Sequence, residues 1–287
     1  MSQNRRDFIK TSAAFSAAAA LLPSCITSTS EKGVPEIGLQ LYTVRDQMAK
    51  DPEGTLERVA KIGYKKIETA GYADGKVYGF PGEVFAELLD GLGLEFVSGH
   101  IVKQHFEQSF DQVLEFLVEA GQQYAILPWL SPEERSTLDQ YKQLGELLNR
   151  CAEKAQPAGV TICYHNHDFE FVEIDGELPM NVLISELDPK LVSIELDLYW
   201  VTKAGLDPLQ YLKMNKGRIP LWHVKDMADT PEKGFAEVGE GIIDYPAIFD
   251  LGSQVGMKHF FVEQDQSDDP MKSIETSYVN LTKKILV

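Results

Sequence analysis

The stretch VTICYHNHDFE, residues 160–170, joins a short apolar run to two imidazoles and two carboxylates. A continuous apolar run of this length predicts a buried β-strand. Three later runs have the same form, an apolar strand that ends in a side chain able to bind a metal: SIELD at 193–197, IPLWH at 219–223 and FFVE at 260–263. Because parallel strands of a barrel end at one rim, this repetition predicts a site at that rim.

Strands and helices alternate from Val34 to the end of the chain. The strands are expected at 37–42, 65–68, 94–98, 124–128, 160–165, 191–197, 218–223 and 258–263, and the helices at 55–62, 84–92, 110–120, 132–156, 181–187, 208–214, 245–255 and 270–286. Eight such units within 34–287 predict one α/β domain, a (β/α)8 TIM barrel. A doubly wound sheet is disfavoured because no Gly-x-Gly-x-x-Gly phosphate loop follows an early strand.

Composition excludes several other classes of protein. Of the 287 residues, 44% are hydrophobic and 25% charged, as in an ordinary globular protein. The formal net charge of −17 repels phosphate backbones, so we expect no nucleic-acid partner. The 3 cysteines form no CxxC pair, which argues against a disulfide framework. Cys151 and Cys163 are expected to be small buried residues.

Residues 1–30 have the pattern of an export signal and are excluded from the fold. NRRDFIK at 4–10 carries the paired arginines of a twin-arginine signal, and an Ala-rich apolar segment at 13–22 follows. LPSC at 22–25 resembles a lipoprotein processing site, with Cys25 as the residue that would carry the lipid. We therefore expect export to the periplasm and leave open whether a lipid anchors the protein to the membrane.

The last inward side chains of the fifth to eighth strands are predicted to be His165, Asp197, His223 and Glu263. Each residue has a plainer interpretation, such as a helix cap for Asp197 or a lysine pair for Glu263. Their recurrence on four successive strands favours a common metal site. Two imidazoles and two carboxylates suit Mn²⁺, Zn²⁺, Fe²⁺ or Co²⁺.

Other side chains are candidates for contact with a substrate at the same rim. His167 is expected to lie behind the ligands or to touch the substrate, and His100 follows the third strand. Aromatic residues could stack on a sugar ring, but a packed core is the prediction for Trp129, Tyr199 and Trp200. The candidates for substrate contact are His100, His167, Glu68, Arg45 and Trp200.

Six motifs together resemble the sugar phosphate isomerase/epimerase branch of the xylose-isomerase-like TIM barrels. The motifs are QLYTVR at 40–45, YHNHDFEF at 164–171, ELDLYW at 195–200, HVKD at 223–226, VGEG at 238–241 and VEQD at 262–265. This superfamily also contains the family 2 AP endonucleases, inosose dehydratases and ketose 3-epimerases. The resemblance covers about 34–287 and implies one divalent metal, often Mn²⁺, at His165, Asp197, His223 and Glu263.

One position departs from the resemblance. The ketose epimerases have a glutamate where this chain has His165, and two metal-bound glutamates act there as paired acid and base. A metal-bound imidazole has no free lone pair for that role, so the two-glutamate mechanism is not expected here. Inosose dehydratase-like members also carry histidines on this strand, which favours dehydration or hydration as the alternative chemistry.

These features predict an enzyme that acts on a small carbohydrate. The metal would bind a carbonyl and a neighbouring hydroxyl of a sugar or keto-sugar, and Glu263 would take the proton between them to give an enediolate. Lys225, Glu170 or His100 would act as the acid. Isomerisation or epimerisation is the first prediction, and a keto-sugar or inosose dehydratase is the alternative.

Two rival functions belong to other classes. A sugar-binding lipoprotein could have kept the barrel without catalysis, but the complete ligand set argues against that. An endonuclease-type phosphodiesterase needs three metals and further histidines, and Trp200 stands where that family has a ligand histidine.

Overall fold

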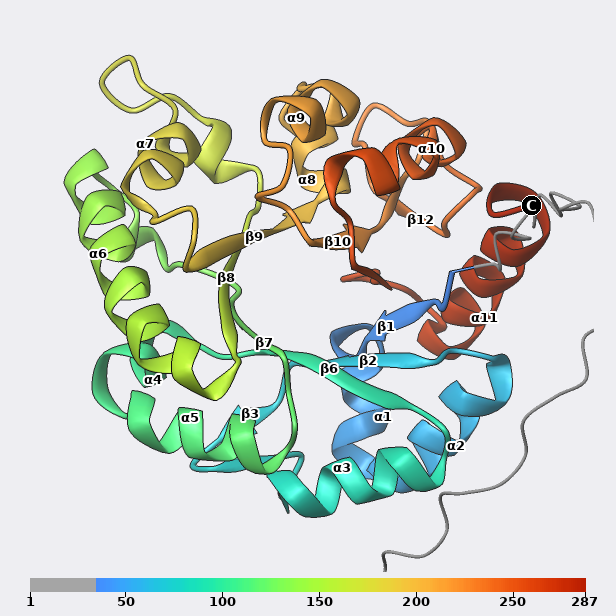
Figure 1. The fold of residues 1–287 in the computed structure, drawn as a ribbon. Coiled ribbons are helices and arrows are strands. Elements are labelled where there is room, and N and C mark those ends of the chain that lie inside the picture. The colour runs from blue at the N-terminus through green and yellow to red at the C-terminus, as the bar shows by residue number, and fades with distance from the viewer. Residues whose placement is uncertain (1–34) are drawn as a thin grey trace, which may run out of the picture. The chain divides into compact units, whose positions relative to one another are not determined.

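The computed structural model describes residues 35–287, so the export signal and Cys25 lie outside the described residues. Eight parallel strands close into a barrel, as predicted (Figure 1). Round the barrel they follow the order β1-β13-β10-β9-β8-β7-β6-β2. Their bounds are β1 Gly38–Gln40, β2 Lys66–Thr69, β6 Glu95–His100, β7 Tyr124–Leu127, β8 Thr161–His165, β9 Val192–Asp197, β10 Leu221–Val224 and β13 His259–Val262.

The helices lie outside the ring of strands (Figure 1). They are α1 Arg45–Lys50, α2 Pro52–Ile62, α3 Gly82–Gly91, α4 Lys103–Gln108, α5 Phe110–Glu119, α6 Leu138–Ala155, α7 Pro179–Glu186, α8 Leu198–Lys203, α9 Pro208–Met214, α10 Tyr245–Val255 and α11 Pro270–Asn280. Within the described part of the chain, no helix is long and apolar enough to cross a membrane. Cys151 and Cys163 are buried and free, as predicted.

The predicted helix at 132–156 is wrong at its start. A 3₁₀ turn, Pro132–Glu134, comes first, and α6 begins only at Leu138. The reason is that Ser131 and Thr137 each form a capping box, with Glu134 and Gln140 respectively, so the segment contains two helix starts. The last predicted helix is also shorter, because α11 ends at Asn280 and a π-helical segment, Leu281–Ile285, follows.

Several short elements at the ends of the strands were not predicted. After β2 the chain forms a small antiparallel sheet from β3 Tyr72–Ala73, β4 Lys76–Val77 and β5 Phe80–Pro81. After β10 it forms a second sheet, from β11 Asp226–Met227 and β12 Phe235–Ala236. These elements and α1, α4 and α8 are too short to show a clear hydrophobic period.

The lower half of the barrel interior is filled with apolar side chains. One buried cluster contains Val97, Ile126, Cys163, Leu221 and Phe261, one from each of five strands. Gly38 on β1 makes room for it, because a Cβ at this position would lie 2.5 Å from the Phe261 ring. The interior is therefore a packed core that closes the barrel below the site.

A β-bulge in β6 turns His100 toward the barrel axis. Ile67 pairs with Phe96 and Glu68 with Ser98, so Val97 is the extra residue in β6. Val97 packs inside with the apolar cluster, and Ser98 and His100 then share the inward face. Ser98 Oγ donates to Glu68 at 2.5 Å.

Asp226 organises the long connection after β10. Its side-chain oxygens accept hydrogen bonds of 2.8 to 3.1 Å from four backbone amides, those of Met227, Gly239, Gly241 and Ile243. The residue is fully buried, so these bonds are shielded from water. This carboxylate therefore holds the connection in place.

Asp226→Ala is expected to destabilise the fold by at least about 3 kcal/mol, because it leaves several buried amides without an acceptor. Urea unfolding followed by fluorescence measures the change. Asp229→Ala, at an exposed position of the same connection, is the control and should change stability by less than about 0.5 kcal/mol. Equal effects of the two substitutions would contradict this role.

Candidate metal centre

The four predicted ligands converge at the carboxyl ends of β8, β9, β10 and β13. One ligand atom from each of His165, Asp197, His223 and Glu263 lies within 4.8 Å of every other, and all four residues are buried. His223 Nδ1 lies 2.8 Å from Glu263 Oε2, and His165 Nε2 lies 3.8 Å from Asp197 Oδ2. We call these four residues the outer set.

Lys225 balances the charge of the outer set. Its Nζ lies 2.6 Å from Glu263 Oε2, 2.9 Å from Asp197 Oδ2 and 2.7 Å from Asp265 Oδ1. Burial lowers the pKa of Lys225, but the nearby charges of Asp197, Asp265 and Glu263 outweigh it and raise the pKa well above the usual value. The lysine is therefore a buried ammonium.

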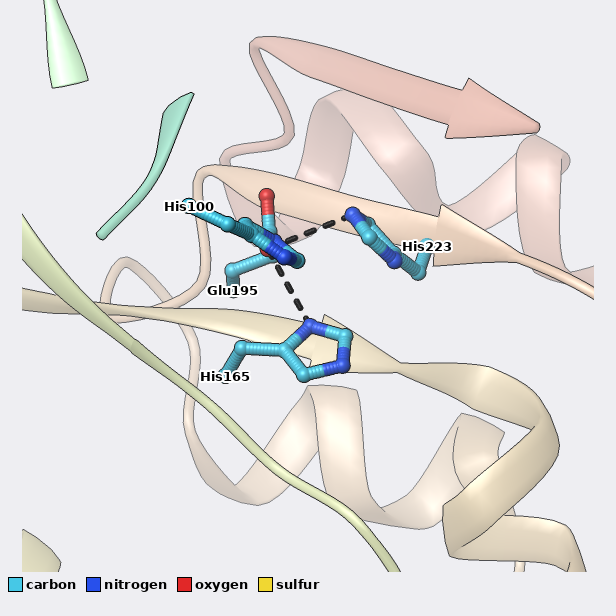
Figure 2. A group of neighbouring side chains, drawn as sticks. All are labelled: His100, His165, Glu195 and His223. Atoms are coloured by element: carbon cyan, nitrogen blue, oxygen red, sulfur yellow. Dashed lines mark hydrogen bonds and ion pairs between the residues drawn. The ribbon is translucent and has the colours of Figure 1, made fainter. Parts of the chain in front are cut away.

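Two further carboxylates, Glu68 and Glu195, lie deeper in the barrel. Figure 2 shows three imidazole rings around Glu195. Glu195 Oε2 lies 2.9 Å from His100 Nε2 and 3.1 Å from His165 Nδ1. Glu68 Oε1 lies 2.5 Å from His223 Nε2 and also accepts a bond from Gln40 Nε2. These carboxylates contact the ring nitrogens of His165 and His223 that face away from the outer set.

The inner carboxylates set the charge of His223. Burial lowers the pKa of His223, yet Glu195, Glu263 and Glu68 together raise it to about 10. His165 differs, because burial and the positive charges of its neighbours hold its pKa well below the usual value. In the absence of a metal, His223 is therefore an imidazolium ion and His165 is neutral.

A pocket of about 480 Å³ opens above the outer set, within the range of about 300–1,000 Å³ typical of small-molecule sites. It brings together six of the residues predicted from the sequence. They are His100, His165, His167, Lys225 and Glu263, and Arg45 reaches the same pocket from the rim.

Two predicted substrate contacts do not line this pocket. Glu68 is fully buried beneath His223, where it orients the imidazole. Trp200 packs beside the pocket, against His167 and Phe235. Tyr199 is buried, as predicted. The expectation that Trp129 belongs to the core is wrong, because the side chain is 48% exposed and lines the pocket mouth.

Glu170 lies below the surface of the pocket rather than in its lining. It is fully buried and accepts hydrogen bonds from the Tyr164 hydroxyl at 2.5 Å and from the His167 amide at 2.8 Å. These bonds fix the turn that carries His167. The position supports a structural role for Glu170.

Sequence reasoning assigned no role to Glu195 or Asp265. Both residues could have been found from the sequence, because side chains two residues apart on a strand lie on the same face of the sheet. This spacing puts Glu195 on the same face as Asp197, and Asp265 on the same face as Glu263. Gln40 and Ser98 carried no such signal, because their role depends on contact with Glu68.

The side chains present fit a divalent cation. Asp197 Oδ2 is buried without a well-oriented hydrogen bond, as is Glu195 Oε1. Imidazoles and carboxylates with unmet lone pairs are the donors that such ions take. The chain is thus a (β/α)8 TIM barrel with a group of side chains at its strand ends that could hold a metal ion.

The chain belongs to the xylose isomerase-like TIM barrel family, whose model matches residues 56–277. A twin-arginine translocation signal matches residues 2–21. An inosose dehydratase from Lacticaseibacillus casei is 27% identical over 166 residues, which are 52% of this chain and 55% of that protein. The match thus spans about half the length of this relative.

Solved structures share the fold. A sugar phosphate isomerase/epimerase from Parabacteroides distasonis has a TM-score of 0.77 at 23% identity and covers 93% of this chain and 100% of its own. The IolI protein, solved with a bound zinc atom, has a TM-score of 0.69 at 18% identity and covers 88% of this chain and 99% of its own.

Asp197→Asn is expected to weaken Mn²⁺ binding at least about 100-fold, because it removes one of two carboxylates from the outer set. Mn²⁺ titration followed by electron paramagnetic resonance measures the affinity, and circular dichroism checks that the barrel is folded. Asp250→Asn, exposed on α10, is the control. Retention of the wild-type affinity by Asp197→Asn would place the Mn²⁺ site elsewhere.

Glu170 should make stability depend on pH. Burial raises the pKa of Glu170 to about 7, although the hydrogen bonds from Tyr164 and His167 act in the opposite direction. The folded state therefore holds a proton that the unfolded state has lost, and stability should fall by about 3 kcal/mol as pH rises from about 4.5 to about 7.

Glu170→Gln should remove most of this decline, because glutamine resembles the protonated acid. Urea unfolding at pH 5, 6, 7 and 8 measures it, with Glu177→Gln at an exposed position as the control. If the free energy of unfolding changed with pH in the same way for the wild type and Glu170→Gln, the Glu170 carboxyl would not titrate in this range.

Proposed function

We propose that the protein is a divalent-metal-dependent enzyme that removes a proton next to the carbonyl of a sugar or keto-sugar and returns it in an isomerisation or epimerisation. The observation that carries this proposal is the pairing of Glu263 with Lys225, at 2.6 Å, in the floor of the pocket. A carboxylate and an ammonium side by side provide a base and an acid for one substrate.

Both groups begin in the required protonation state. Burial raises the pKa of Glu263, but Lys225 and His223 lower it well below the usual value, so the carboxylate is ionised. Lys225 holds its proton. A substrate that entered between them would lengthen the ion pair, which would raise the pKa of Glu263 and make it a stronger base.

The outer set would hold the cation, which would supply polarisation of the sugar carbonyl and an adjacent hydroxyl. His165 and His223 are held in orientation by Glu195 and Glu68, as ligating histidines usually are by an outer carboxylate. The bound zinc of the IolI structure supports a divalent ion. His167 also lines the pocket, so its ring would lie beside a bound substrate.

The pocket mouth suits an uncharged sugar ring. Trp129 and Tyr42 are 48% and 41% exposed there, and Arg45 lies over the Tyr42 ring. Aromatic faces bind the apolar faces of sugars.

The twin-arginine signal directs the protein to the periplasm, where free or oxidised glycosides are the expected substrates, and a lipid on Cys25 would anchor it to the membrane.

Dehydration of a keto-sugar or inosose is the second candidate. It is favoured by His165 at the position of the fifth-strand glutamate of ketose epimerases, and by curated relatives that are inosose dehydratases. Both reactions begin with the same proton removal and differ in the fate of the Lys225 proton. If Lys225 gives its proton to a β-hydroxyl, water leaves; if a proton returns to carbon, the sugar is isomerised or epimerised.

The test is to incubate metal-loaded protein with ketoses, 3-keto-glycosides and inososes in D₂O and to follow the products by NMR. Deuterium uptake or a new epimer is the expected result, whereas an enone would identify the dehydratase. Glu263→Gln should slow the reaction at least about 100-fold. Glu232→Gln, at an exposed loop position, should leave it unchanged. Metal-loaded protein that alters none of the sugars would overturn the proposal.

A further inference from the structure

We propose that the barrel holds a second cation position beneath the outer set, formed by His100, His165, Glu195 and His223, which takes Zn²⁺ or Co²⁺ in preference to Mn²⁺. We call these four residues the inner set; Figure 2 shows them. The proposal concerns metal binding alone and is independent of the reaction catalysed in the pocket.

The geometry of the inner set is close to that of a four-coordinate metal site. Three imidazole nitrogens surround Glu195 Oε2: His100 Nε2 at 2.9 Å, His165 Nδ1 at 3.1 Å and His223 Nε2 at 3.2 Å. Ligand atoms of a tetrahedral zinc site lie roughly 3.3 Å apart, given bonds of about 2.0–2.1 Å. All four ligand atoms lie within 4.8 Å of one another, so a bound ion would draw the ligands closer together.

The inner set also contains a buried carboxylate oxygen without a hydrogen-bond partner. Glu195 Oε1 is buried and has no hydrogen-bond partner. Glu68 Oε1, 3.2 Å from His100 Nε2, brings a second fully buried carboxylate to the same place. In residues 35–287, every ion pair of Glu68 and Glu195 is with a histidine. By contrast, Lys225 already pairs with both carboxylates of the outer set.

The two sets compete because they share His165 and His223 but use opposite ring nitrogens. His165 presents Nδ1 to the inner set and Nε2 to the outer set. His223 presents Nε2 to the inner set and Nδ1 to the outer set. A neutral imidazole has a lone pair on one nitrogen and a proton on the other. The shared rings therefore serve one cation at a time.

Donor chemistry decides which position an ion takes. The inner set offers three nitrogens and one carboxylate, whereas the outer set offers two of each. Imidazole suits zinc, and carboxylate suits manganese. Zn²⁺ or Co²⁺ in the inner set leaves Lys225 paired with Asp197 and Glu263, so the metal lies beneath the position where a sugar would be bound.

The test uses the full chain and two variants, each of which changes one set. His100→Phe removes a nitrogen from the inner set alone and keeps an aromatic ring against His223, whose ring centroid lies 5.3 Å from that of His100. Asp197→Asn removes a carboxylate from the outer set alone. Affinities for Zn²⁺ and Mn²⁺ are measured by competition with a chromogenic chelator, with His105→Phe on α4 as the control.

We expect His100→Phe to weaken Zn²⁺ binding at least tenfold and to change Mn²⁺ binding less than threefold. We expect Asp197→Asn to weaken Mn²⁺ binding at least tenfold and to change Zn²⁺ binding less than threefold. X-ray absorption of the Zn²⁺-loaded wild type should show three imidazole ligands, a result that does not depend on how a variant folds. Unchanged Zn²⁺ affinity in His100→Phe, or only two imidazoles around zinc, would overturn the inner position. Turnover enters neither measurement, so a failed activity assay leaves this result unaffected.

Discussion

The structure depends on the burial of four carboxylates inside one barrel. Glu68, Glu195 and Asp197 are fully buried and Glu263 is 4% exposed, so their charges must be balanced within the interior. His223, held as a cation, and Lys225 supply positive charge from the protein's own side chains, and His100 and His165 contact Glu195. The need for compensation explains why the lysine is buried, why His223 is held as a cation, and why the cluster suits a divalent ion.

Much of the site can be predicted from strand spacing. Each apolar run ends at the same rim, so side chains such as Asp197 and His223 had to meet once the barrel closed. The rest could not be predicted from local pattern. The bulge at Val97 turns the side chains of Ser98 and His100 toward the inside of the barrel. This bulge depends on the pairing of β6 with β2 rather than on the residues of β6 alone. Glu195 looked like a neighbour of Asp197, and its partners come from two other strands and β6.

His165 distinguishes this barrel from one with a glutamate at the same place. A glutamate would leave a free oxygen beside a bound metal, whereas the imidazole is tied to Glu195 through its other nitrogen. In the proposed function, the acid and base would be Lys225 and Glu263, which lie on the same side of the pocket. This pair alone can serve isomerisation or loss of water, whereas epimerisation also needs a proton donor on the opposite face of the substrate.

The packed floor beneath the site has a consequence for how the protein can change over time. Gly38 and Phe261 close the barrel from below, whereas Tyr42, Val102 and Trp129, which follow the strands, belong to the mouth. Variation in the mouth can therefore alter the size and shape of the molecule admitted without disturbing the buried charges below. The same interior can serve a succession of specificities, each acquired by changing loops alone.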